Sequence, residues 1–266
     1  MKKYLLISVL SLILVFFVTA SLACAGEWVT FKGNSETGDE LSLKGILNKP
    51  QGQGPFPAVV MLHGSSGIEG GNRYLDIWAQ RLASWGYISL QVDSFGPRGQ
   101  SDISGNPARI PPNWRAQDAH DAKSYLAELP FVNRNQIALM GWSHGGWSTL
   151  YAIENDFIEN RGDPFRCAIA FYPYCSKDLN LYAPLLILIG ELDDWCPAVL
   201  CQAKVERMPS GKTTPEIILK VYPQAYQCFD FEGIDTSKKG HRLLYNQAAA
   251  SDAVEQVKNF LAKYAK

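Results

Sequence analysis

The stretch Ile137-Ala138-Leu139-Met140-Gly141-Trp142-Ser143-His144-Gly145-Gly146 decides how this chain folds. Its first four residues form an apolar run that predicts a buried strand, and residues 147–153 have the character of a helix. A Gly-x-Ser-x-Gly pattern on such a strand-to-helix turn lifts the serine hydroxyl clear of the sheet. The two outer glycines let neighbouring backbones pass closely because no Cβ stands between them. We therefore predict that Ser143 is a nucleophile.

Apolar runs alternate with helical periodicity along the rest of the chain, a pattern that predicts a doubly wound, mostly parallel α/β sheet with helices on both faces. Buried strands are expected at 58–62, 87–92, 137–140, 167–172, 185–189 and 217–222, and helices at 74–85, 114–129, 147–153, 197–206 and 246–264. Strands at 27–32 and 40–47 are expected to add an antiparallel edge. Residues 93–113 are rich in proline and glycine and predict a long functional loop.

Size and charge narrow the class of protein. The chain has 266 residues, of which 47% are hydrophobic, enough for one sizeable core, so residues 26–266 are expected to form a single domain. The formal net charge is −1 and no basic stripe is present, which argues against a nucleic-acid partner.

Residues 1–25 have the features of a signal peptide. Lys2 and Lys3 precede an apolar run at 4–18, and Ala23-Cys24-Ala25 supplies a cleavage site, so the mature chain is expected to begin at Gly26. The protein is thus predicted to be exported, periplasmic or secreted, with no stable membrane insertion after signal removal. An uncleaved anchor is the alternative, although the run is short for a membrane span.

The cysteines are interpreted in the light of export. Lipidation of Cys24 is a minority alternative, because Ser21 stands where a lipobox prefers an aliphatic residue. Removal of the signal peptide also removes Cys24 and leaves five cysteines: Cys167, Cys175, Cys196, Cys201 and Cys228. Because five is an odd number, at least one of these cysteines is free or pairs outside the chain. The first expectation for a disulfide is Cys196–Cys201; the alternative is that all five are small core residues. No Cys/His spacing resembles a zinc site.

A nucleophilic serine needs a base to take its proton and an acid to orient that base. In this architecture the chain order is serine, acid, histidine. Asp193 follows the strand expected at 185–189 and is the predicted acid. Asp194 is the substitute, and helix capping is the alternative role for both carboxylates.

An oxyanion hole needs two N–H donors. The backbone N–H of His144 is one, and that of Ser65, in the loop His63-Gly64-Ser65-Ser66-Gly67, is the expected second. The His144 side chain is expected to pack or hydrogen-bond rather than act as the base, and His63 is expected to support its loop.

These motifs together resemble the dienelactone hydrolase family of α/β-hydrolases over residues 28–264. The matching segments are the 63–67 loop, Asp93-Ser94-Phe95-Gly96-Pro97-Arg98-Gly99, the Ser143 turn, the 190–197 loop and Tyr222-Pro223-Gln224-Ala225. The resemblance implies hydrolysis of a small ester or lactone through an acyl-enzyme, without metal or cofactor. One departure is that namesake members use a cysteine nucleophile where this chain has Ser143.

A second departure concerns the base. Relatives carry Tyr-Pro-x-Ala-x-His-x-Phe after the last strand, whereas residues 222–229 place Gln227 at the histidine position. Glutamine hydrogen-bonds a serine but cannot accept its proton. His241 is the one histidine after the acid and is the expected replacement; its alternative is a surface or loop-stabilising role.

Residues near the strand ends are candidates for binding substrate. Trp142 and Trp195, together with Trp147, Tyr172 and Tyr174, are expected to form an apolar acyl pocket, with core packing as the alternative for each. Arg98 is expected to receive a substrate carboxylate, with a solvated surface arginine as the alternative.

The main hypothesis is an exported serine hydrolase with Ser143, Asp193 and His241 as catalytic residues. The alternative, motivated by Gln227, is a catalytically silent fold that binds a ligand or partner. A peptidase is less favoured, because no additional domain to restrict peptide access is evident.

Overall fold

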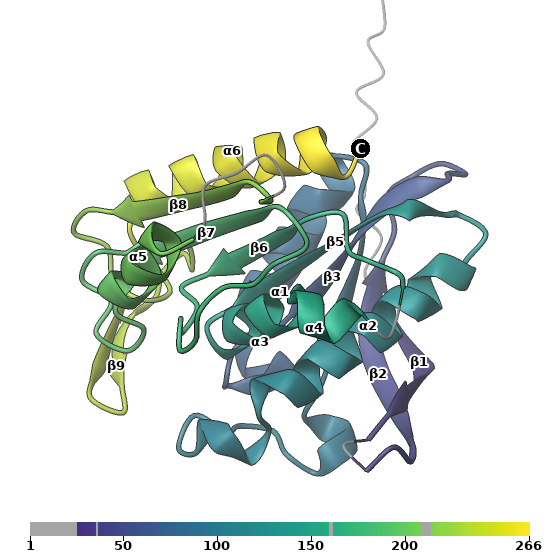
Figure 1. The fold of residues 1–266 in the computed structure, drawn as a ribbon, viewed down its shortest axis with the longest axis horizontal. Helices are drawn as coiled ribbons and strands as arrows, with labels where there is room; N and C mark the ends of the chain where they lie inside the picture. Colours follow the sequence, from purple (N-terminus) through teal and green to yellow (C-terminus); the bar gives the residue numbers. More distant parts are fainter. Residues whose placement is uncertain (1–25, 36, 160–161, 209–213) are drawn as a thin grey trace, which may run out of the picture.

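A computed structural model describes residues 26–35, 37–159, 162–208 and 214–266. The proposed signal peptide lies outside the described residues, so its cleavage and the fate of Cys24 stay predictions. Within the described chain an eight-stranded sheet has the order β1-β2-β4-β3-β5-β6-β7-β8 (Figure 1). The doubly wound α/β architecture predicted from the sequence is confirmed.

The sheet is parallel except at one edge, where β2 runs antiparallel to both β1 and β4. This confirms the predicted antiparallel edge. The strands are β1 (Glu27–Asn34), β2 (Glu40–Asn48), β3 (Phe56–Leu62), β4 (Ile88–Asp93), β5 (Val132–Trp142), β6 (Ala168–Phe171), β7 (Leu185–Gly190) and β8 (Ile217–Tyr222). Every residue of β4, β6 and β7 is buried, as expected of parallel strands covered on both faces.

Helices cover both faces of the sheet (Figure 1). They are α1 (Gly67–Ser84), α2 (Pro112–Glu128), α3 (His144–Ala152), α4 (Asn155–Ile158), α5 (Ala198–Glu206) and α6 (Gln247–Tyr264). Helices α2 and α3 pack on each other and on β5, α1 packs on β4, α5 on β8 and α6 on β7. None of the helices in the described ranges is sufficiently long and apolar to span a bilayer.

A small hairpin, which was not predicted from the sequence, precedes α6. Strands β9 (Asp235–Lys238) and β10 (His241–Leu244) pair with each other and with no strand of the main sheet. No strand was predicted between residues 229 and 246. Its short strands carry polar side chains such as Asp235 and Lys238 in place of an apolar alternation, so the usual signal of a strand is missing.

The long loop after β4 contains two short 3-10 turns, Gly96–Arg98 and Pro107–Arg109. Three of its apolar side chains form a small separate core, against which Trp114 packs: Phe95, Ile103 and Ile110. The Ile103 N–H donates to the Ser65 carbonyl at 2.8 Å, so this loop braces the one that follows β3.

The turn between β5 and α3 depends on glycine at two positions. A Cβ added at Gly145 would overlap the carbonyl oxygens of Leu62 and His63, and one at Gly141 would overlap the Gly145 carbonyl. The end of β5, the start of α3 and the end of β3 therefore pack backbone against backbone, which brings the loop after β3 beside Ser143.

We predict that Gly145→Ala lowers the free energy of unfolding by about 1–3 kcal/mol, because backbone atoms with no room to move oppose the added methyl. Urea unfolding followed by circular dichroism measures this. Gly105→Ala is the matched control, since a Cβ there meets its nearest neighbour, Lys239 Nζ, at an ordinary 3.7 Å. Equal unfolding midpoints for the two variants would contradict the prediction.

Candidate active site

Ser143 occupies the turn between β5 and α3 with φ 52° and ψ −114°. A non-glycine residue at positive φ is strained by about 1–3 kcal/mol and persists only where its surroundings hold it. Here the Ser143 N–H donates to the Phe171 carbonyl at 2.9 Å, and the Ser143 carbonyl accepts from the Trp147 N–H at 2.8 Å. The strand-to-helix presentation expected of a nucleophile is present.

Gln227, in the segment that follows β8, faces Ser143. Its Nε2 donates to Ser143 Oγ at 2.8 Å, and the residue is only 2% exposed. Its Oε1 is buried and has no hydrogen-bond partner among the described residues. The backbone is fixed by β10, because the Leu244 N–H donates to the Gln227 carbonyl at 3.3 Å. The amide is thus positioned to orient the Ser143 hydroxyl.

Asp193 lies in the loop after β7 and is 3% exposed. Its Oδ1 accepts the N–H groups of Trp195 at 3.0 Å and Cys196 at 2.8 Å, while Oδ2 is buried without a hydrogen-bond partner in the described chain. Burial raises the pKa of this carboxyl to about 7, because these two hydrogen bonds only partly offset the loss of solvation. The carboxyl is placed as an acid would be, yet no histidine is bonded to it.

All four histidines of the chain lie within the described residues, and none hydrogen-bonds Ser143. His63 Nδ1 lies 2.8 Å from the Gly64 carbonyl, and His120 Nε2 lies 2.9 Å from the Ala152 carbonyl. His144 Nε2 lies 3.1 Å from the Pro107 carbonyl. Burial lowers the pKa of His144 to about 3, with the Arg115 charge as a second cause. The side-chain roles expected for His63 and His144 agree with these contacts.

The structure does not bring His241 to Ser143. His241 begins β10, and its ring stacks on Trp195 with centroids 4.7 Å apart. Its Nδ1 lies 3.4 Å from Asp194 Oδ1. Within the described residues it bonds neither Ser143 nor Asp193, so its expected role as base is corrected to the alternative, a surface or loop-stabilising histidine. The polar hairpin was not recognised in the sequence, and its register turns this side chain toward Asp194.

The two expected oxyanion donors lie beside Ser143. His144 is the first residue of α3, so its N–H has no acceptor within the helix, and Ser65 borders the same cavity. The positive end of the helix dipole at His144 favours a developing negative charge here. Both backbone groups are therefore available to a bound carbonyl.

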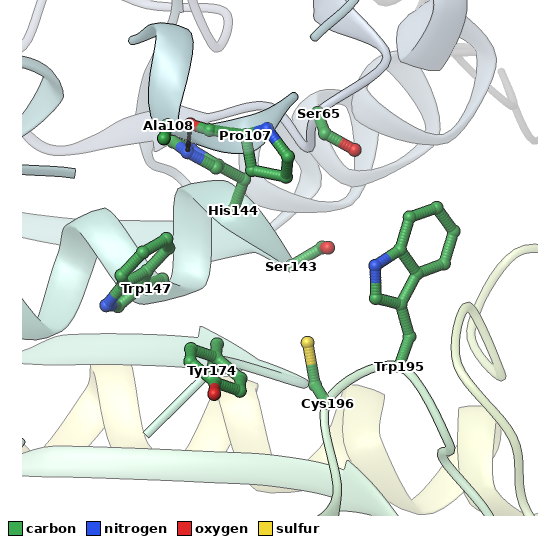
Figure 2. Close-up of a pocket in the computed structure, with 9 residues that line it drawn as sticks. All are labelled: Ser65, Pro107, Ala108, Ser143, His144, Trp147, Tyr174, Trp195 and Cys196. Carbon is green, nitrogen blue, oxygen red and sulfur yellow. Dashed lines mark hydrogen bonds between the residues drawn. The ribbon is translucent and has the colours of Figure 1, made fainter. Parts of the chain in front are cut away.

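A cavity of about 350 Å³ opens beside Ser143 (Figure 2). Figure 2 shows the Ser143 hydroxyl directed into the space bordered by Ser65, Trp195 and Cys196. The lining residues are Ser65, Pro107, Ala108, Ser143, His144, Trp147, Tyr174, Trp195 and Cys196. A smaller cavity of about 90 Å³ meets it at Ser143 and is bordered by Gln227, Tyr74 and Lys238. The described residues contain no cluster of three side chains suited to hold a metal ion.

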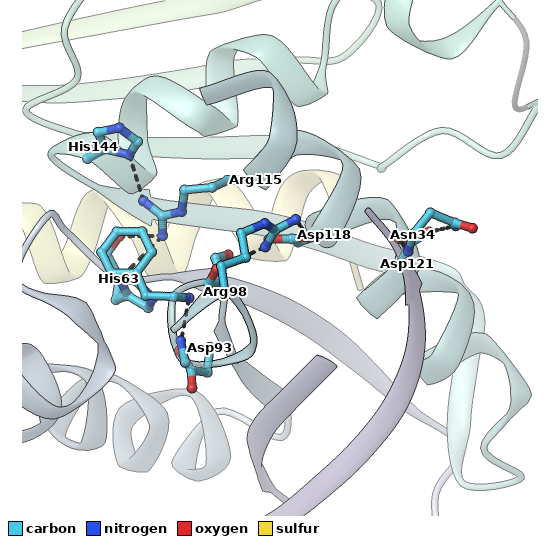
Figure 3. Close-up of polar contacts among 11 residues, drawn as sticks. Asn34, His63, Asp93, Arg98, Arg115, Asp118, Asp121 and His144 are labelled. Carbon is cyan, nitrogen blue, oxygen red and sulfur yellow. Dashed lines mark hydrogen bonds and ion pairs between the residues drawn. The ribbon is translucent and has the colours of Figure 1, made fainter. Parts of the chain in front are cut away.

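Two residues expected to bind substrate, Arg98 and Trp142, do not line the larger cavity. Arg98 forms a bidentate ion pair with Asp118, with both N···O distances 2.9 Å, and donates to the Ser94 carbonyl (Figure 3). Trp142 is fully buried, and its Nε1 donates to Asp230 at 3.1 Å. The expected role of Arg98 is therefore corrected to fold support. Trp142 borders the smaller cavity at Ser143, and Trp195 borders both cavities.

The disulfide joins Cys175 to Cys201 and not Cys196 to Cys201, so that expectation was wrong. The expectation rested on the short separation of the two cysteines in sequence. In the structure Cys196 lies before α5 and turns toward Gln227, with Cys196 Sγ 4.0 Å from Gln227 Nε2. The observed bond ties α5 to the segment that carries Tyr174, one of the residues that line the cavity. Among the described cysteines, Cys167, Cys196 and Cys228 are free thiols.

Two buried charged groups beneath the site, Asp230 and Arg115, were not predicted from the sequence. Asp230 accepts hydrogen bonds from Trp78 at 3.0 Å, Trp142 at 3.1 Å and Tyr172 at 2.8 Å. Arg115 is fully buried on α2. A weak signal existed for Arg115, because it shares a helix face with the small residues Ala119 and Ala122. No comparable signal marked Asp230.

Comparison with known proteins identifies the family. The model of the dienelactone hydrolase family matches residues 43–265, most of the chain. The chain belongs to the dienelactone hydrolase family, within the α/β-hydrolase superfamily. Solved structures of similar fold include a dienelactone hydrolase from Anabaena variabilis, with a TM-score of 0.64 and 18% identity over 91% of this chain and all of that one. A dienelactone hydrolase-like promiscuous phosphotriesterase from metagenomic libraries has a TM-score of 0.67 and 17% identity over 90% of this chain and 99% of that one.

Curated relatives of this family member are larger proteins. Acylamino-acid-releasing enzyme 2 of Oryza sativa is 26% identical over 71% of this chain and 23% of its own length. A dipeptidyl-aminopeptidase B of Talaromyces marneffei is 27% identical over 51% of this chain and 15% of its own length. The chain thus spans less than a quarter of the length of these relatives.

We predict that Asp193 makes this family member less stable as the pH rises. The folded protein keeps the Asp193 proton up to about pH 7, whereas the unfolded chain releases it near 3.8, so stability is lost between these values. Between pH 5 and pH 8 the free energy of unfolding of the wild type should fall by about 2–3 kcal/mol more than that of Asp193→Asn, whose side chain does not ionise. Urea unfolding at both pH values measures the difference, and parallel pH dependences would refute the assignment.

Proposed function

We propose that the protein is a serine hydrolase that cleaves a small carboxylic ester or lactone through an acyl-Ser143 intermediate. The observation that carries the proposal is the strained Ser143 turn, which presents its hydroxyl to a cavity shared with Ser65 and His144. A cavity of about 350 Å³ with aromatic walls suits a small apolar molecule.

The site supplies three of the parts that acyl transfer requires. Ser143 Oγ attacks the carbonyl carbon, and the N–H groups of Ser65 and His144 hold the oxygen that becomes negative. The Gln227 amide donates to Oγ at 2.8 Å and so fixes the rotamer of the hydroxyl. Water then attacks the acyl group and releases the acid.

Proton removal is the step that this site performs weakly. An amide is not basic enough to take the Ser143 proton, so the proton is relayed through water to the oxygen of the departing alcohol or phenol, and the rate depends on the acidity of that leaving group. A positioned base contributes roughly 10²–10⁴-fold to such reactions. We therefore expect slow turnover that favours activated esters and strained lactones.

The hydrogen bond from Gln227 favours a second candidate function. A serine held by a glutamine, with none of the four histidines bonded to it, suits a protein that binds a carbonyl compound without turning it over. In that case the same cavity binds ligand but Ser143 never becomes acylated. The two candidates differ in whether a covalent adduct forms at Ser143.

Labelling by a fluorophosphonate probe separates them. We predict that the probe modifies Ser143 in folded protein, identified by peptide mass spectrometry, and that Ser143→Ala abolishes labelling. Ser251→Ala, an exposed serine on α6, is the matched control and should label like the wild type. Absence of labelling in the wild type would favour the binding function.

Restoring the histidine tests the assigned roles of Gln227 and Asp193. We predict that Gln227→His raises the rate of p-nitrophenyl acetate hydrolysis by about 10²–10⁴-fold, because an imidazole accepts the Ser143 proton while its other nitrogen donates toward the unpartnered Asp193 Oδ2. Gln224→His, at an exposed position, is the control. A panel that includes aminoacyl p-nitroanilides tests peptide-like substrates, which the curated relatives suggest. No gain in the variant would contradict the assignment.

Export is a further part of the proposal. The signal-like segment at 1–25 supports it, and so does the Cys175–Cys201 disulfide, because such bonds persist in oxidising compartments. N-terminal sequencing of protein recovered from the periplasm or medium should begin at Gly26; recovery of the intact N-terminus from the cytoplasm would contradict export.

A further inference from the structure

Arg115 lies behind the candidate active site and has no part in the function proposed so far. Its side chain comes from α2, is fully buried and reaches toward the loop after β3. Figure 3 shows its guanidinium between His144 and His63. In the described chain it forms no ion pair with a carboxylate, so this cation is held in the interior by neutral partners.

The contacts of this guanidinium connect the two segments that carry the oxyanion donors. Nη1 lies 2.9 Å from His144 Nδ1, and Nη2 donates to the His63 carbonyl at 2.7 Å. A guanidinium only donates, so Nδ1 of His144 accepts and the ring proton resides on Nε2, which donates to the Pro107 carbonyl. One side chain therefore links the residue after the nucleophile to the loop that contains Ser65.

Aromatic packing fixes the plane of the guanidinium. Its carbon lies 4.9 Å from the centre of the Phe95 ring, and Phe95 contacts His63 edge-on with centroids 4.4 Å apart. An arginine held by two directed hydrogen bonds and a ring has few alternative positions. A lysine would offer the same charge but cannot reproduce the planar fork.

Arg115 also places a positive charge beside the two segments that carry the oxyanion donors. Burial lowers the pKa of Arg115 to about 10, with the Asp118 charge opposing this, so it stays cationic at neutral pH. The charge lies next to the N-terminus of α3, and both act in the same direction on a nearby anion. Low local polarity strengthens that effect.

We propose that Arg115 is the positioning residue of the oxyanion hole, holding the N–H groups of His144 and Ser65 in mutual alignment. The inference rests on the hydrolase function proposed above. Because the alignment matters only once the carbonyl oxygen becomes negative, Arg115 should act on the transition state and leave ground-state binding almost unchanged.

The test compares a ligand that occupies the oxyanion hole with one that does not. Benzeneboronic acid forms a tetrahedral adduct on Ser143 with an oxygen in the hole, whereas benzyl alcohol only fills the aromatic cavity. For Arg115→Met we expect about 10–100-fold weaker boronate binding and less than a threefold change for benzyl alcohol. Arg109→Met, an exposed arginine in the turn beside the site, is the matched control and should behave as the wild type.

Further variants guard against misfolding as the cause. Arg115→Lys keeps the charge but loses one of the two hydrogen bonds, so it should weaken boronate binding selectively, as Arg115→Met does. If Arg115→Met does not unfold cooperatively, Arg115→Lys takes its place in the test. In Arg115→Ala, millimolar methylguanidinium should restore boronate binding. In the Gln227→His background, Arg115→Lys should lower kcat by about 10–100-fold with KM little changed.

Three outcomes overturn the proposal. Boronate binding unchanged in both variants, or boronate and benzyl alcohol weakened equally, would leave Arg115 a purely structural residue while the hydrolase function stands. A wild type that forms no boronate adduct and hydrolyses no ester would overturn the proposed function and this inference together.

Discussion

The close backbone contact between the end of β3 and the turn after β5 is the constraint on which the site depends. Only glycine at positions 141 and 145 permits it, and it sets Ser143 beside the loop of His63 and Ser65. The strain at Ser143 is tolerated because neighbouring backbone groups hold both ends of the turn. Without this approach the nucleophile and the donors on the β3 loop would belong to separate parts of the sheet edge.

Buried polar groups around that contact differ in how fully their hydrogen bonds are satisfied. Arg98 and Asp118 neutralise each other, and the Asp230 carboxylate has three aromatic donors. Asp193 Oδ2 and Gln227 Oε1, by contrast, are buried without a hydrogen-bond partner among the described residues. A buried acceptor left unpaired costs about 1–3 kcal/mol, a cost that a hydrogen-bond donor placed between these two atoms would remove. Both belong to the candidate site.

The sequence predicted the sheet, the antiparallel edge and the Ser143 turn, because these depend on local patterns of apolar residues and glycine. It also placed Asp193 after the strand that became β7, and the residue to which it drew attention, Gln227, contacts Ser143 in the structure. It did not predict the fate of His241, Arg98 or the disulfide, since these depend on where side chains from distant segments meet. The hairpin that contains His241 has polar strands, and the partner of Arg98 lies 20 residues away on α2.

The Cys175–Cys201 bond has a consequence for how the protein should be prepared. It closes a 26-residue span and contributes about 3.5 kcal/mol in the loop-entropy model, yet none of the eight strands of the main sheet contains either cysteine. Chains produced in a reducing cytosol will therefore reach the same sheet while the aromatic wall at Tyr174 is released from α5. Two preparations with identical circular dichroism spectra can then differ in ligand affinity. A measurement of free thiols in each preparation distinguishes the oxidised protein from the reduced one.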